Sequence, residues 1–168
     1  MTTILPERAV LRNAGISTTS DPSVAVPSDG NAFTVTGLQV RVLDENSVNY
    51  GSLLVGHRGS SSFTIESKST VNGNSSVDDI GANAAPNARA DLLMVGNADR
   101  SVTLYWQLPN NDYPNTPDNW QAYNGTGQFA SALPAFGADV YVGVVTYAYG
   151  SSGVPFVGSA DAFTVTPE

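Results

Sequence analysis

The stretch Ser101–Leu108, SVTLYWQL, decides the fold class of this chain. Apolar side chains occupy every second position, and the positions between them carry Ser, Thr, Tyr and Gln: the apolar set is Val102, Leu104, Trp106 and Leu108. A period of two places alternate side chains on opposite faces of an extended chain. We therefore expect a β-strand with one buried face.

The same alternation recurs on both sides of this stretch. Further strands are predicted at residues 32–36, 38–43, 50–55, 62–66, 91–95, 140–149 and 163–165, with Gly37 separating the first two. Residues 56–62, 67–90 and 109–127 are polar and are expected to be loops. No segment of ten or more residues has a helical apolar stripe. The sequence therefore predicts an all-β fold, an antiparallel β-sandwich that is jelly-roll-like.

The first 31 residues differ in composition from the rest. They are rich in Ser, Thr, Asp and Pro, with an early apolar patch at Ile4, Leu5, Val10 and Leu11. We expect residues 1–31 to form an extended N-terminal arm that uses this patch in assembly. Residues 32–168 are expected to form a single β-sandwich domain.

The pentapeptide AFTVT occurs twice, at Ala32–Thr36 and at Ala162–Thr166. A duplication would repeat the flanking strands, and it does not. Two interpretations stay open: the ordinary composition of β-strands, or two strands that pair as antiparallel neighbours, as the first and last strands of a jelly-roll barrel do.

The charge balance excludes several classes of partner. The 168 residues carry a net charge of -8, only 13% are charged, and Lys68 is the one lysine. Nucleic-acid surfaces and polybasic membrane patches need clustered Lys and Arg, so no direct nucleic acid and no polybasic membrane contact are expected. No apolar run approaches the length of a transmembrane span, so no membrane insertion is expected. The chain has no cysteine, no glycine-rich phosphate loop and no other cofactor motif, so no cofactor is predicted.

Catalytic and metal motifs are weak. The one histidine, His57, stands near Ser60, Ser61 and Ser62, but no nucleophile-elbow motif accompanies it. We interpret it as a loop histidine and the protein as not an enzyme. Calcium needs only oxygen ligands, and three acidic groups could supply them: Asp78 with Asp79, Asp112 with Asp118, and Asp44 with Glu45. No calcium-loop motif accompanies them, and we interpret these groups as solvated turns.

The most distinctive loop is NNDYPNTPDNWQAYNGTG, residues 110–127. It holds three aromatic and two acidic side chains: Tyr113, Trp120, Tyr123, Asp112 and Asp118. Aromatic rings beside carboxylates and amides can hold a sugar, which makes this loop a candidate glycan site. The alternatives are local packing under the loop and a contact between subunits, where Tyr and Trp are enriched.

An N-terminal arm, a cysteine-free β body, low charge and long Asn/Pro/Gly loops together give the chain a resemblance of pattern. It resembles virion structural proteins of bacteriophages and viruses, the single jelly-roll coat proteins and the decoration or cement proteins of capsids. The resemblance implies a virion protein, made in the host cytoplasm, that binds other virion subunits and forms a homo-oligomer, a trimer or a larger array. The alternative function is a lectin-like β-sandwich that uses residues 110–127.

Overall fold

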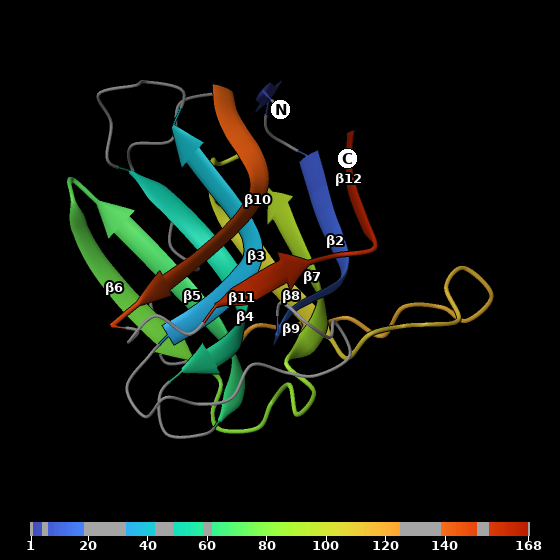
Figure 1. The fold of residues 1–168 in the computed structure, drawn as a ribbon. Helices are drawn as coiled ribbons and strands as arrows, with labels where there is room; N and C mark the ends of the chain where they lie inside the picture. Colours follow the sequence, from blue (N-terminus) through green and yellow to red (C-terminus); the bar gives the residue numbers. More distant parts are fainter. Residues whose placement is uncertain are drawn as a thin grey trace.

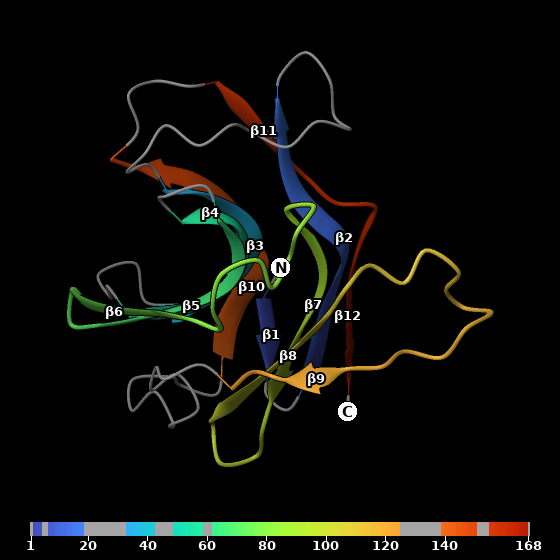
Figure 2. The same cartoon turned by 90° about the horizontal axis from the view of Figure 1, so that it is seen from below.

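The computed structural model describes residues 2–4, 7–18, 33–42, 49–58, 62–124, 139–150 and 155–167. All regular structure in these residues is β, and it forms two antiparallel sheets that face each other as a sandwich (Figures 1 and 2). The predicted fold class is confirmed. The strand order is compatible with a jelly roll without establishing one.

Sheet A has six strands in the order β1-β10-β3-β4-β5-β6. Their bounds are β1 Thr2–Ile4, β10 Asp139–Tyr149, β3 Phe33–Val42, β4 Tyr50–Arg58, β5 Phe63–Val71 and β6 Asn74–Asp79. Strands β3 to β6 follow one another as a meander, and β10 returns from far along the chain to pair with β3 over its whole length.

Sheet B has the order β11-β2-β7-β8-β9, and β12 also pairs with β2. The bounds are β11 Phe156–Ser159, β2 Glu7–Thr18, β7 Arg89–Gly96, β8 Val102–Gln107, β9 Gln121–Ala122 and β12 Ala162–Pro167. Strand β12 covers residues 7–12 of β2 and β11 covers residues 15–18, so two short strands share one edge.

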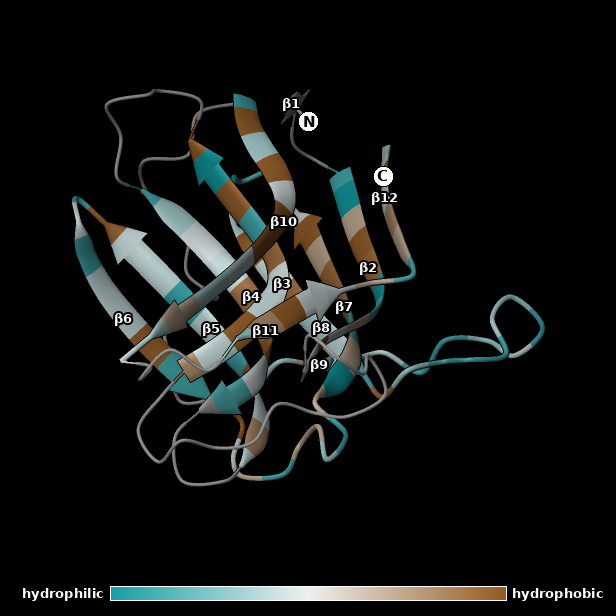
Figure 3. Cartoon of the chain, in the orientation of Figure 1, coloured by the Kyte–Doolittle hydropathy of each residue, from teal (hydrophilic) through white to brown (hydrophobic). Residues whose placement is uncertain are grey.

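The core lies between the two sheets, where the apolar side chains of alternate positions meet. Figure 3 shows hydrophobic and hydrophilic residues alternating along β2, β3 and β10. The central buried side chains are Leu11, Leu38, Val40, Leu53, Val55, Ile65, Leu92, Met94, Leu104, Val140 and Val142. The period of two reports the buried face at Val102 and Leu104, and Trp106 packs partly buried against the core. It fails at the end of Ser101–Leu108, because Leu108 lies beyond β8 and is 52% exposed, whereas Gln107 is only 5% exposed.

The predicted N-terminal arm needs a correction. Residues 7–18 form β2, which lies between β7 and the pair β11 and β12 in sheet B. Leu11 is only 1% exposed and Val10 is half-buried, so Leu11 is a core residue. Ile4 lies in β1, opposite Asp139 of β10, and Leu5 lies outside the described residues, as do residues 19–32. The strand was missed because β2, with the sequence ERAVLRNAGIST, has no unbroken period of two, and its register shifts between Leu11 and Ala14.

A bulge divides β2 into two halves. The register against β7 shifts between Leu11 and Ala14, and Asn13 has a φ of 48°, in the left-handed region that Asn tolerates better than most residues. The Asn13 amide N–H donates to Asp91 at 2.7 Å, and its side chain donates to Asp161 at 3.0 Å. These bonds hold the kink at which β12 gives way to β11.

Gly37 does not end a strand, contrary to the expectation. It lies within β3, where a Cβ would collide with the Leu53 carbonyl oxygen and come within 2.9 Å of the Leu54 Cα. Glycine in a strand can mark a close approach of two backbones, and here it allows β3 to lie against β4 without a break.

All three predicted loops contain strand residues: residues 56–62 include the end of β4, and residues 109–127 include β9. Residues 67–90 include the end of β5 and the whole of β6, joined through Asn72 and Gly73 with φ of 50° and 80°. The dipeptide Asn-Gly is a strong hairpin signal that was available in the sequence. His57, expected in a loop, lies in β4, is 1% exposed, and packs edge-on against Phe63 at 5.9 Å between ring centroids.

The two AFTVT segments do not pair with each other. Phe33–Thr36 belongs to β3 in sheet A, whereas Ala162–Thr166 belongs to β12 in sheet B and pairs with Arg8–Arg12 of β2. The prediction of adjacency is therefore wrong, and the repeat reflects the ordinary composition of strands.

Candidate functional site

The segment 108–120 joins β8 to β9 and projects away from the sandwich (Figure 1, right). Asp112 forms one of its turns, because its carboxylate accepts hydrogen bonds from the Thr116 hydroxyl at 2.6 Å and the Asn115 amide at 3.4 Å. The bond from Thr116, followed by the one from Asn115, lowers the pKa of Asp112. The loop is thus internally ordered.

Arg12 of β2 ties this loop to sheet B. Its guanidinium makes two hydrogen bonds of 2.7 Å to the two carboxylate oxygens of Asp118, and a third of 3.0 Å to Asp91 of β7. The planar guanidinium matches a carboxylate in this two-pronged way. The bond to Asp118 raises the pKa of Arg12, and the same pair holds the pKa of Asp118 at about 2.

Two aromatic rings of the loop lie against the same guanidinium. The Arg12 carbon Cζ is 4.0 Å from the centre of the Tyr113 ring and 5.2 Å from that of Trp120. Cation–π contact at this range is attractive. The structure therefore brings together three of the five loop residues singled out from the sequence, but it gathers them around an arginine of the chain itself.

Amide side chains complete this cluster. Gln107 donates to Asp91 at 2.9 Å and to Asp118 at 3.0 Å, while its carbonyl oxygen accepts from the Asn119 N–H at 2.7 Å. The Asn110 side chain adds a bond of 3.2 Å to Asp118. The carboxylate of Asp112 thus accepts from donors of the loop itself, whereas that of Asp118 accepts from Arg12 of β2, Gln107 of β8 and Asn110. The cluster is therefore a brace that holds the loop against sheet B.

Tyr123 is not part of the cluster around Arg12. It packs against the core, and its hydroxyl donates to Asp78 at 3.0 Å and accepts from the Ser67 N–H at 3.3 Å. Burial, with Asp78 adding to it, raises the pKa of Tyr123 against the effect of the Ser67 bond. This residue ties the end of the loop to β5 and does not join Tyr113 and Trp120.

A cleft that the sequence did not indicate lies on the outer face of sheet A. It has a volume of about 380 Å³ and is lined by Phe33, Glu66, Lys68, Ser75, Val77, Tyr147 and Tyr149. These residues come from β3, β5, β6 and β10, and Figure 2 shows the sheet curving so that β10 and β6 flank this face on the left. The alternation of Tyr147 and Tyr149 on one face of β10 was the available signal.

The Lys68 ammonium lies over two of the rings near this cleft. It is 5.2 Å from the centre of the Tyr147 ring and 5.7 Å from that of Tyr50. Burial alone would raise the pKa of Tyr50, but hydrogen bonds with Thr70 and Lys68 lower it. Burial, and then the carboxylate of Glu66, raise the pKa of Tyr147.

Strand β12 presents an uncovered edge. Among the described residues it pairs with β2 alone, and most of its residues are exposed. Phe163 is 37% exposed. The strand carries no charged side chain between Ala162 and Pro167.

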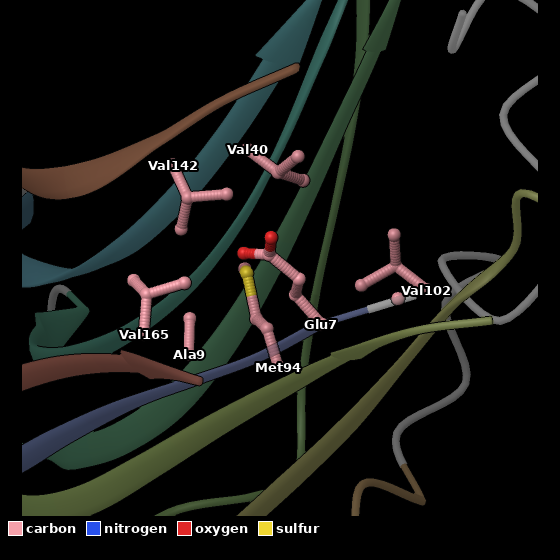
Figure 4. A pocket seen from close by; sticks show the side chains of 8 residues that line it. Glu7, Ala9, Val40, Met94, Val102, Val142 and Val165 are labelled. Carbon is pink, nitrogen blue, oxygen red and sulfur yellow. The ribbon is translucent and has the colours of Figure 1, made fainter. Parts of the chain in front are cut away.

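A small cavity lies between the sheets at the end of β2 (Figure 4). The Glu7 carboxylate points toward it, among Met94, Val40 and Val142. Its volume of about 20 Å³ is room for one water at most. This space is therefore no ligand site.

The described residues contain no group of three or more His, Cys, Asp or Glu side chains placed to hold a metal ion. Asp44 and Glu45 lie outside those residues. In the part of the chain with assigned structure, no helix has the length and apolarity to cross a membrane. Comparison of the chain with known protein families, curated proteins and solved structures finds no match.

Proposed function

We propose that this chain is a non-enzymatic structural protein of virions, a coat or decoration subunit that binds copies of itself and neighbouring subunits. The observation that carries the proposal is the uncovered edge of β12. Unpaired N–H and C=O groups along a strand edge form a template for another strand, and proteins normally protect them.

The other edges among the described strands are protected. Strand β9 has 2 residues, β1 has 3, and β11, which shares the edge of β2 with β12, has 4, so all three are short for recruiting a strand. Strand β6 is polar and ends in Asp78 and Asp79. Strand β12 has 6 residues, no charge and no proline before its last position. The exposure of this unprotected edge supports a role for β12 in contact with another protein chain.

The occupant that fits this edge is the β12 strand of a second copy. The segment AFTVT is nearly symmetric about Thr164, so antiparallel pairing centred there places Phe163 opposite Val165 of the copy and Thr164 opposite Thr164. Aromatic–β-branched and Thr–Thr pairs stabilise neighbouring strands. A two-fold contact of this kind is self-complementary, and because β12 has no charged side chain, two copies of the strand place no like charges opposite each other.

The braced loop 108–120 supports the proposal as a second contact. Tyr113 is 54% exposed and Leu108 is 52% exposed on a segment that projects from the body (Figure 1). Through this loop, pairs formed at β12 would join into a larger array. The alternative, glycan binding by residues 110–127, has less support because Asp112 already accepts hydrogen bonds within the loop and Asp118 already accepts them from Arg12 of β2.

The test is the mass of the purified protein in solution, measured by light scattering for the wild type, Thr164→Lys and Ser76→Lys. The wild type should be a dimer or a multiple of it. Thr164→Lys places two ammonium groups opposite each other at the proposed contact and should give monomers. Ser76→Lys makes the same change on the exposed edge strand β6 and should keep the wild-type mass.

Circular dichroism checks that both variants are folded. A wild type that stays monomeric at the highest soluble concentration would contradict the proposal. So would a folded Thr164→Lys protein that keeps the wild-type mass.

A further inference from the structure

We infer that the cleft on the outer face of sheet A is a saccharide-binding site, formed by Phe33, Tyr147, Tyr149, Glu66, Lys68 and Ser75. It is separate from both contacts assigned to assembly. Its volume of about 380 Å³ falls within the range of small-molecule sites, roughly 300–1,000 Å³.

The cleft exposes aromatic rings on which a ligand can pack. Tyr149 is 73% exposed, and Phe33 lies 6.3 Å from it between ring centroids at a tilt of 55°. The C–H groups on one face of a pyranose ring are weakly polar and can pack on such a ring. Because the two rings are tilted, they present two differently oriented faces rather than one flat plate.

Hydrogen-bond donors and acceptors lie beside these rings. Glu66 is 3% exposed, and its carboxylate receives a hydrogen bond from the Tyr147 hydroxyl. A carboxylate has about four lone-pair positions, and an ammonium has three N–H donors. Lys68 is held over Tyr147, and Ser75 adds an exposed hydroxyl on β6. Hydroxyl groups of a sugar can donate to Glu66 and accept from Lys68.

The charge of the cleft favours a neutral sugar over other ligands. Glu66 and Lys68 offset each other, and the chain as a whole carries -8, which opposes a phosphate-bearing ligand. A purely apolar ligand would bury Glu66 and Lys68 against carbon, at a cost in desolvation. A saccharide meets the rings and the polar groups at once.

The experiment uses the full chain on an array of immobilised glycans ending in glucose, galactose, mannose, N-acetylglucosamine or sialic acid. The wild type should bind at least one glycan with a neutral terminal sugar, and saturation-transfer NMR with that sugar should show transfer to its ring protons. Tyr149→Ala should weaken binding by about tenfold or more, because it removes the most exposed ring. Glu66→Gln should also weaken it.

Tyr141→Ala is the matched control, because Tyr141 is another exposed tyrosine on β10, at 42%, and does not line the cleft. It should bind as the wild type does. The inference would be overturned if the wild type bound no glycan or bound only sialylated glycans. It would also be overturned if Tyr149→Ala bound with wild-type affinity. Loss of binding in Tyr113→Ala with retention in Tyr149→Ala would assign the sugar to loop 108–120 instead. The array result does not depend on the mass measured for Thr164→Lys, so the two proposals can fail separately.

Discussion

Arg12 connects more parts of the structure than any other residue near the loop. Its guanidinium joins β2 to Asp91 of β7 and to Asp118, and lies against two aromatic rings. Its side chain is 16% exposed and that of Asp118 is 18% exposed, so the pair is largely shielded from water. A pair with two parallel bonds and this shielding contributes more than a typical surface ion pair.

This pair makes stability depend on pH in a defined direction. The pKa of Asp118 falls from 3.8 to about 2 in the folded protein, first because of its bond with Arg12. A carboxyl whose pKa is lowered by folding stabilises the fold above its unfolded pKa, and the contribution is lost as pH falls toward its folded pKa. The free energy of unfolding should therefore decrease from pH 5 to pH 2, by about 1 kcal/mol from this residue after solvent screening.

Urea unfolding of the wild type and of Asp118→Asn at several pH values in this range measures the effect. Asp118→Asn should be less stable at pH 5 and should show a smaller decrease toward pH 2, so that the two curves converge. Parallel curves would contradict the assignment. Asp112→Asn is a control on the exposed part of the loop, where the carboxylate is bonded to Thr116 but not to Arg12.

At the scale of elements, β2 changes how the N-terminal segment should be tested. A protein that lacks residues 1–18 loses the strand between β7 and the β11–β12 pair, and with it the buried side chains of Leu11 and Ile16. Loss of two large core side chains alone costs several kcal/mol. We expect this truncated protein to be unfolded by circular dichroism and by urea titration.

Removal of residues 1–6 is the matched comparison. It deletes β1, a strand of 3 residues that pairs only with residues 139–141 at the edge of sheet A. This protein should fold, with a smaller free energy of unfolding than the wild type. A folded protein without residues 1–18 would show that β2 is dispensable and would restore the description of this segment as an arm.

Most strands could be predicted because one buried face imposes a period of two, as in Ser101–Gln107. The errors arose where a strand is defined by its partner rather than by its own side chains. Residues 7–18 mix Arg, Asn and Gly with Leu and Ile, and the register shift between Leu11 and Ala14 interrupts their period of two. Gly37 and Gly56 resemble breaks but lie where neighbouring backbones leave no room for a Cβ.

The candidate site was harder to predict than the fold. Loop residues Tyr113, Trp120 and Asp118 were recognisable as unusual, but their partner Arg12 lies 106 positions from Asp118 in sequence. The cleft on sheet A draws on β3, β5, β6 and β10, so it exists only once β10 has paired with β3. No local sequence pattern shows that residues so far apart in the chain come together in the fold.

At the scale of the whole molecule, the net charge of -8 opposes the proposed association of copies. Salt shortens the distance over which exposed charges repel, from about 10 Å at 0.1 M to about 3 Å at 1 M. We therefore expect the wild-type dimer to dissociate at a lower protein concentration in high salt than in low salt. Light scattering over a dilution series at two salt concentrations measures this shift. Weaker association in high salt would indicate a contact held by opposite charges rather than by β12.

The register of β12 on β2 has a mechanical consequence. Pro167 lies opposite Glu7, so the two strand ends that are nearest the chain termini lie at the same end of sheet B. Tension applied between these two residues would break the hydrogen bonds between β2 and β12 one after another, starting at this end, instead of loading all of these bonds at once. In the proposed role as a virion subunit, the protein would therefore resist load applied across the faces of the sandwich better than load applied between these two strand ends.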